Sequence, residues 1–123
     1  MESWETAAVR LLRRECGAQA TLGVIGHRWS PMILEALSLR PMRCAELRGA
    51  IPEVSKKVLT ETLRRLERDG LVVRRLAAHD APTRYALTEL GVEAGSLLST
   101  ISRWGEEHLP SVERARRHHD AAA

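Results

Sequence analysis

The sequence contains no phenylalanine and a single tyrosine, and aromatic residues make up only 3% of its 123 residues. A hydrophobic core must therefore be built mainly from leucine, valine, isoleucine and alanine. A chain of this length can bury about two-thirds of the surface that it exposes when unfolded. We expect one folded domain that needs neither a metal ion nor a disulfide bond to be stable.

Cysteine is also scarce, since only Cys16 and Cys44 are present and they form no CxxC pair. Two isolated thiols do not make a disulfide framework and are typical of a reducing cytosol. No apolar run approaches the roughly 18 residues that a membrane span requires. The first residues, MESWETAAVRLLRRE, lack the apolar core of a signal peptide. The sequence therefore predicts a cytoplasmic protein with no membrane partner.

Signatures of an enzyme or a metal centre are missing as well. There is no glycine-rich phosphate loop, no pair of carboxylates in a recognisable cleft and no nucleophile with an evident base. His108, His118 and His119 lie on either side of Pro110, and no cysteine or carboxylate set completes a tetrahedral site. We therefore predict no catalytic residue, no cofactor and no metal site.

What the sequence does have is a series of short elements separated by proline and glycine. Apolar spacing and turn residues predict the following: helices over 3–15, 28–39, 43–51 and 55–69, a helical turn over 20–26, strands over 71–76 and 83–88 joined by a turn at 78–82, and a last helix after residue 88. Ser30, Ser55 and Thr88 stand where N-caps are expected, and Gly70 stands where a helix should end. Pro110 is expected to interrupt the last helix.

The predicted helix over 55–69 has two different faces when its residues are placed 100° apart. Leu59, Leu63 and Leu66 share the apolar side, and cationic residues occupy the opposite side with Thr60 beside them. Such cations suit phosphates and guanine edges. A solvated charged face is the alternative, but the hairpin carries Arg74, Arg75, His79 and Arg84 toward the same surface. The net charge of +3 permits a nucleic-acid partner without demanding one, and the agreement of the two segments favours nucleic-acid binding.

Glu61 is the exception on this cationic face. Its carboxylate could accept a hydrogen bond from the amino group of cytosine. It could instead pair with Arg64 or Arg65, three and four residues further along the helix. We favour the ion pair as the interpretation.

These motifs resemble the HxlR family of winged helix-turn-helix regulators, within the wider MarR-like group. The resemblance rests on motifs in the family's order: Cys16, IGHRW at 25–29, RCAEL at 43–47, SKKVLTETLRRLERDGLV at 55–72, YALTELG at 85–91 and Trp104. The sequence departs from the family pattern at Gly17, where proline is usual, at His27, where glycine is usual, and at Cys44, where phenylalanine is usual.

The expected fold is mostly α with a small β-hairpin, a winged helix-turn-helix over residues 1–110. It comprises an N-terminal dimerisation helix (1–16), the helix-turn-helix (43–70), the wing (71–88) and a C-terminal dimerisation helix (89–109), with a flexible tail over 111–123. The resemblance implies a homodimer that binds double-stranded operator DNA and regulates transcription. The interface is expected to include Trp4, Leu11, Leu97, Ile101 and Trp104; packing of these residues on the monomer core is the alternative.

The DNA contacts that we predict are Ser55, Lys56, Lys57, Thr60, Arg64, Arg75, His79 and Arg84. Cys16 matches the thiol that some family members use as a redox sensor; a small buried residue is the alternative, which we favour. A small-molecule effector near Trp29 and Trp104 is a further hypothesis. The rival function is a winged-helix protein-interaction module without DNA binding.

Overall fold

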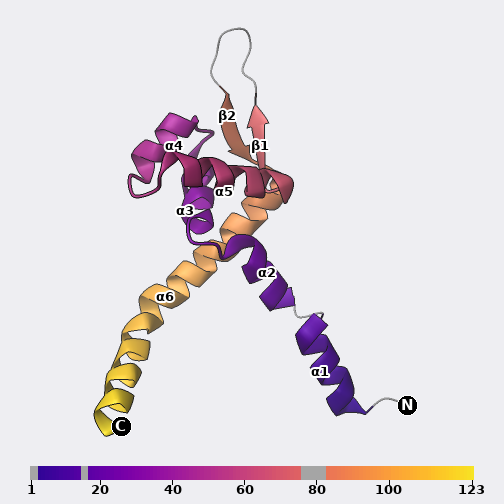
Figure 1. The fold of residues 1–123 in the computed structure, drawn as a ribbon, viewed down its shortest axis with the longest axis vertical. Helices are drawn as coiled ribbons and strands as arrows, with labels where there is room; N and C mark the ends of the chain where they lie inside the picture. Colours follow the sequence, from indigo (N-terminus) through magenta and orange to yellow (C-terminus); the bar gives the residue numbers. More distant parts are fainter. Residues whose placement is uncertain (1–2, 15–16, 76–82) are drawn as a thin grey trace.

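The computed structural model of the chain describes residues 3–14, 17–75 and 83–123, although not the side chains of residues 10–14. Its architecture is mostly helical with one two-stranded antiparallel hairpin, as predicted (Figure 1). The elements are α1 (Trp4–Arg14), α2 (Gly17–Ile25), α3 (Ser30–Leu39), α4 (Cys44–Ala50), α5 (Lys56–Arg68), β1 (Val72–Arg75), β2 (Arg84–Leu87) and α6 (Glu89–Ala122). Helices α3, α4 and α5 and the hairpin form one body, from which α6 and the α1–α2 segment extend as two arms.

Two of the predicted caps are confirmed. The Ser55 hydroxyl oxygen accepts a hydrogen bond from the Val58 N–H at 3.1 Å, at the start of α5. The Thr88 hydroxyl oxygen accepts from the Gly91 N–H at 3.0 Å, at the start of α6. Gly70 follows α5 with a φ of 80°, a left-handed conformation that glycine adopts without steric cost.

The expected cap at Ser30 was wrong. Trp29 occupies the N-cap position of α3, and its side chain makes no capping hydrogen bond. Ser30 is instead the first residue of the helix and is completely buried, with no hydrogen-bond partner for its hydroxyl within the described residues. Burial of Ser30 therefore overrides the local capping preference at this position.

The hairpin is held to the helical body along one strand. β1 pairs with β2 in the register Val72↔Leu87 to Arg75↔Arg84. The other edge of β2 is bridged by Met42, through hydrogen bonds of 3.0 and 2.8 Å between Met42 and Tyr85. The residues before α4 thus act as a short third strand and fix the hairpin beside the helix-turn-helix.

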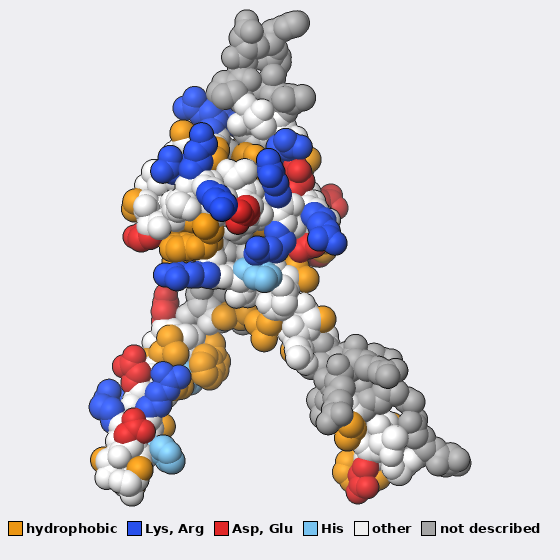
Figure 2. Space-filling model, viewed as in Figure 1, with side chains coloured by type: hydrophobic (Ala, Val, Ile, Leu, Met, Phe, Trp, Pro, Cys, Tyr) orange, Lys and Arg blue, Asp and Glu red, His pale blue; other side chains and the backbone are white. Residues whose placement is uncertain are grey.

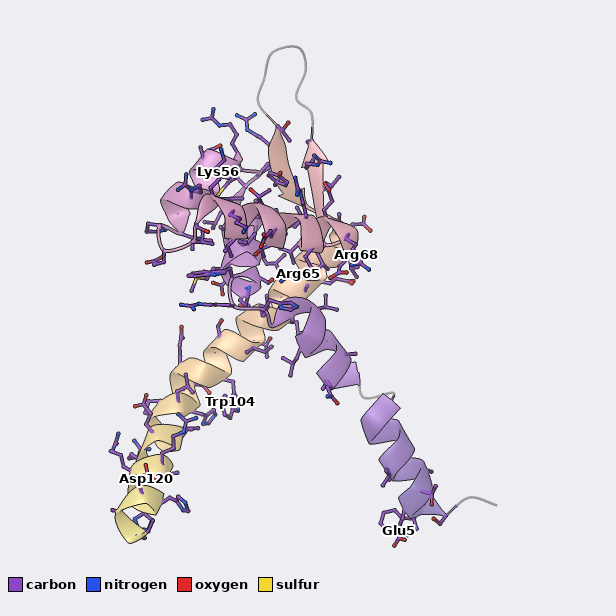
Figure 3. All side chains as sticks on the ribbon, in the orientation of Figure 1. Glu5, Lys56, Arg65, Arg68, Trp104 and Asp120 are labelled. Carbon is purple, nitrogen blue, oxygen red and sulfur yellow. The ribbon has the colours of Figure 1, made fainter. Side chains whose placement is uncertain are left out.

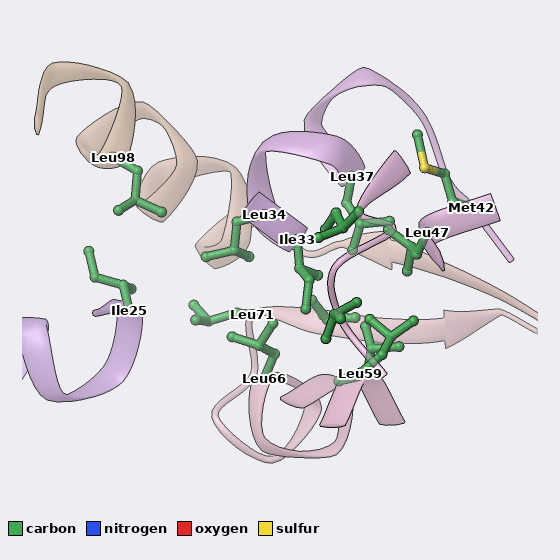
Figure 4. Packing of buried hydrophobic residues seen from close by; sticks show 14 residues of the cluster. Ile25, Ile33, Leu34, Leu37, Met42, Leu47, Leu59, Leu66, Leu71 and Leu98 are labelled. Carbon is green, nitrogen blue, oxygen red and sulfur yellow. The ribbon is translucent and has the colours of Figure 1, made fainter. Parts of the chain in front are cut away.

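A single aliphatic core joins these elements (Figure 4). Ile33 and Leu34 of α3, Leu47 of α4 and Leu59 of α5 are each fully buried within it. Cys44 packs against the same cluster, as predicted. The apolar side of α5 is therefore fixed inward, which leaves its other side facing outward.

The expected interruption of the last helix at Pro110 was also wrong, because α6 continues from Glu89 to Ala122 with Pro110 inside it. Residues 111–122 are therefore helical, although the sequence predicted a flexible tail. Proline removes one backbone hydrogen bond and crowds the preceding turn. Residue 110 and its neighbours are exposed, so water can satisfy the freed carbonyl group.

Among the described helices, none has a stretch apolar enough to cross a bilayer.

Candidate nucleic-acid interface

Helix α5 presents a row of charged side chains to solvent. Lys56 lies at one end of the helix and Arg68 at the other (Figure 3). Lys57, Arg64 and Arg68 are exposed, and Arg65 is partly buried. None of these four residues forms an ion pair within the parts of the chain that the structure describes. The predicted cationic face is thus available to a polyanion rather than being neutralised by the protein itself.

The hydroxyl groups of α5 have different remaining capacities. Ser55 uses a lone pair as the helix cap, so its O–H remains able to donate to a phosphate. The Thr60 hydroxyl donates to the Lys56 carbonyl oxygen at 2.8 Å, which leaves it only as an acceptor. Thr62 donates in the same way to Val58 at 2.7 Å and is buried, so it faces the core.

The ion pair that we favoured for Glu61 was wrong. The carboxylate is exposed, and it lies within 4.0 Å of neither the Arg64 nor the Arg65 guanidinium group. Glu67, on the same helix, does pair: its Oε2 atom lies 2.8 Å from Nε of Arg74 in β1. This pair connects α5 to the hairpin, whereas Glu61 lies on the outward side without an ion pair among the described residues.

The wing cations divide between the two faces of the hairpin. Arg74 is drawn toward α5 by Glu67. Because alternate strand residues point to opposite faces, Arg75 and its partner Arg84 lie together on the other face. Two like charges directly opposite each other are unfavourable in isolation. A phosphate group between them would relieve this repulsion.

Arg75 also lines a cavity of about 470 Å³ between α3, β2 and α6, together with Arg40, Ser38 and Ser99. Both Arg75 and Arg84 remain exposed at the hairpin end of the molecule. Figure 2 shows Lys and Arg side chains gathered over the face formed by α4, α5 and the hairpin. The α5 cations and the wing cations thus lie toward one end of the molecule, although Arg75 and Arg84 do not share the hairpin face that Arg74 turns toward α5.

A cluster of ion pairs at the N-terminal end of α4 was missed by the sequence analysis. Glu46 lies 2.7 Å from Nη1 of Arg40 and 3.1 Å from Nε of Arg43, and its Oε1 atom accepts the Arg43 N–H at 3.1 Å. The Arg43 backbone N–H, followed by the two guanidinium groups, lowers the pKa of Glu46 from 4.5 to about 2. A glutamate at the third helical position is a known capping signal that could have indicated part of this cluster.

Three predicted residues lie, wholly or by their side chains, outside the described part of the chain. Cys16 and His79 lie outside the described residues, as does the side chain of Leu11. Of the histidines considered for a metal site, His108 contacts Trp104, with 5.0 Å between the ring centroids. Within the described residues, no three histidine, cysteine or carboxylate side chains are grouped as metal ligands would be.

This geometry agrees with a match to a protein family. The model of the HxlR-like helix-turn-helix family matches residues 24–113, which run from the end of α2 into α6 and include the cationic α5 and the hairpin. The chain belongs to the HxlR-like helix-turn-helix family. It is a transcriptional regulator with a DNA-binding winged helix-turn-helix fold, and the predicted resemblance is confirmed.

Relatives of this HxlR-like regulator support the assignment. The HTH-type transcriptional regulator YkvN of Bacillus subtilis is 38% identical over 91 residues, which cover 73% of this chain and 77% of YkvN. The redox regulator HypR in its reduced form superposes with a TM-score of 0.73 at 29% identity, covering 80% of this chain and 99% of HypR. Reduced YodB of Bacillus subtilis gives a TM-score of 0.70 at 27% identity, covering 76% of this chain and 93% of YodB.

Proposed function

We propose that this regulator is a cytoplasmic homodimer that binds operator DNA with α5 in the major groove and the hairpin beside it. The observation that carries the proposal is the outward face of α5. Its cations are exposed and unpaired among the described residues, while its apolar side is locked into the core. The N-terminus of α5 adds free backbone amides, which carry a partial positive charge suited to a phosphate.

The proposed contacts have different tasks. Lys56, Lys57 and the Ser55 hydroxyl stand at the helix N-terminus, where they would hold the phosphate backbone. Arg64 stands further along the same face, where its guanidinium group can read a guanine edge. Thr60 can accept a hydrogen bond from a base. From the wing, Arg75, His79 and Arg84 would contact phosphates or the minor groove.

The two arms support the proposed dimer. Trp4 is 77% exposed, Trp104 is 56% exposed, and Leu97 and Ile101 are 45% and 44% exposed. Leu97, Ile101 and Trp104 recur at intervals of four and three residues, so they form one apolar stripe along α6. Large apolar side chains arranged in a stripe are typical of an interface. A two-fold dimer would also place two α5 helices roughly 34 Å apart, one turn of DNA.

A gel shift with the DNA upstream of the protein's own gene tests the proposal. We expect retarded complexes that resist competition by random DNA and that weaken as salt rises. The rival is a winged-helix module that binds only proteins. Absence of any salt-dependent binding, to this DNA or to a pool of random duplexes, would favour that rival.

We further propose that Cys16 is a redox-sensing thiol, because HypR is described as a redox regulator and YodB has been crystallised after diamide treatment. Arg13 and Arg14 are close in sequence and would favour the reactive thiolate. Diamide should then release DNA from the wild type and from Cys44→Ser, but not from Cys16→Ser. Equal release from all three proteins would exclude Cys16 as the sensor.

A small-molecule effector is tested separately by thermal shift, since a ligand of the folded state raises Tm.

A further inference from the structure

Glu61 occupies the middle of the outward face of α5. It is the sixth residue of the helix, and the residues one turn away on the same face are Lys57 and Arg64. Thr62 and Leu63, which follow it, are buried, so the direction of Glu61 is fixed toward solvent by the packing of the helix. A molecule that contacts Lys57 and Arg64 together must also meet the Glu61 carboxylate.

Two other glutamates near this face, Glu46 and Glu67, form ion pairs, unlike Glu61. Glu46 is held by Arg40 and Arg43, and Glu67 is held by Arg74. Glu61 has Lys57, Arg64 and Arg65 at spacings that suit an ion pair, yet within the described part of the chain it forms none. The carboxylate therefore does not serve to orient these cations, and a structural role does not account for it.

An unpaired carboxylate is unfavourable on a surface that approaches phosphates. It repels the DNA backbone, and it also repels the oxygen and nitrogen acceptors that guanine and thymine present in the major groove. Cytosine presents an N4 amino group there and no acceptor, which makes it the best-matched base for a carboxylate. Adenine offers an amino group beside the N7 acceptor and matches less well.

We propose that Glu61 determines sequence specificity by accepting a hydrogen bond from a cytosine amino group in each operator half-site. The proposal rests on the proposed function, because it requires α5 to lie in the major groove. Glu61 contributes discrimination more than affinity, because it stabilises the complex most at cytosine, less at adenine, and destabilises it at guanine and thymine.

Selection of bound duplexes from a random DNA pool tests this proposal with the full-length protein. The wild type should enrich a half-site with one position fixed as cytosine. Glu61→Ala should lose the preference at that position alone. Glu61→Gln should change it to adenine, because an amide side chain pairs with the N6 and N7 atoms of adenine. Glu106→Gln on α6 removes the same charge far from α5 and should select the wild-type sequence.

Affinities on the selected site give the size of the effect. Replacing the cytosine should weaken wild-type binding on the order of tenfold and Glu61→Ala binding by less than about twofold. If both Glu61 variants bind DNA and select the wild-type sequence unchanged, the role of Glu61 is wrong while the proposed function stands. If the wild type enriches no sequence and shows no salt-dependent binding, the proposed function itself fails.

Discussion

Gly91 shows how a single residue sets the position of a whole helix. It is buried in the first turn of α6, where a Cβ atom would meet the Leu71 carbonyl oxygen and approach Leu87 to 3.2 Å. We expect Gly91→Ala to lower the free energy of unfolding by about 2–3 kcal/mol through overpacking. A Cβ atom at Gly95, one turn later, would have no neighbour within 4 Å. Gly95→Ala should therefore raise the free energy of unfolding by about 1 kcal/mol, because alanine has the higher helix propensity. Urea denaturation measures both, and equal effects would contradict the close approach.

Glu46 gives a prediction on pH dependence. The pKa of its carboxyl group is lowered from 4.5 to about 2 in the folded protein. Its contribution to stability is therefore complete above pH 4.5 and is lost as the pH falls toward 2. Between pH 6 and pH 2.5, the Tm of Glu46→Gln should fall less than that of the wild type. Glu106→Gln should follow the wild type, and an identical fall for Glu46→Gln would show that its ion pairs add no stability.

Residue-level prediction from sequence succeeded where the cause was local and failed where it was not. Ser55 and Thr88 cap their helices because the amides that they satisfy lie three residues away. Ser30 has the same chemistry, but packing of α3 buries it. The lack of an ion pair at Glu61 among the described residues, and the pairing of Glu67 with Arg74, depend on side-chain positions that helical spacing alone does not determine.

At the scale of elements, α5 and the hairpin should contribute differently to DNA binding. Arg64→Ala should weaken binding to the operator by about tenfold and to random DNA much less, because a base contact is lost. Fluorescence anisotropy with the two DNA types measures this difference. Equal weakening on both would mean that Arg64 contacts phosphate rather than a base.

Arg84→Ala belongs to the same scale but should act through charge alone. Losing one phosphate contact should weaken binding to every sequence alike and reduce the slope of log K against log salt by ~1. A salt titration of wild type and variant gives both slopes, with Arg114→Ala on α6 as the control for overall charge. An unchanged slope would remove Arg84 from the proposed interface.

The boundaries of these elements were largely predictable, since α5, β1, β2 and the start of α6 follow from apolar spacing and turn residues. The far end of α6 was not. Pro110 favours a break, because proline inside a helix costs about 3 kcal/mol or more. The flanking residues of α6, rich in glutamate, arginine and alanine, favour helix on both sides and offset that cost.

At the scale of the whole molecule, the apolar stripe on α6 should control assembly. Ile101→Glu would place a charge in the proposed interface, so we expect monomers by light scattering and much weaker operator binding. Val92→Glu is the matched control, because Val92 is also exposed but lies on another side of α6. If Ile101→Glu remains dimeric, the interface lies elsewhere.

Thr88 has a mechanical consequence for such an assembly. Its hydroxyl donates to the Gly70 carbonyl at 2.6 Å and its N–H to the Leu71 carbonyl at 3.1 Å, while it caps α6 directly after β2. Thr88 is the single residue between β2 and α6, so no flexible linker separates them. The residues that follow α5, Gly70 and Leu71, are hydrogen-bonded to this same residue. In the proposed dimer, a tilt of α6 in one subunit would therefore move the α5 helix and the hairpin of that subunit with it. The distance between the two α5 helices, and hence the affinity for DNA, would change.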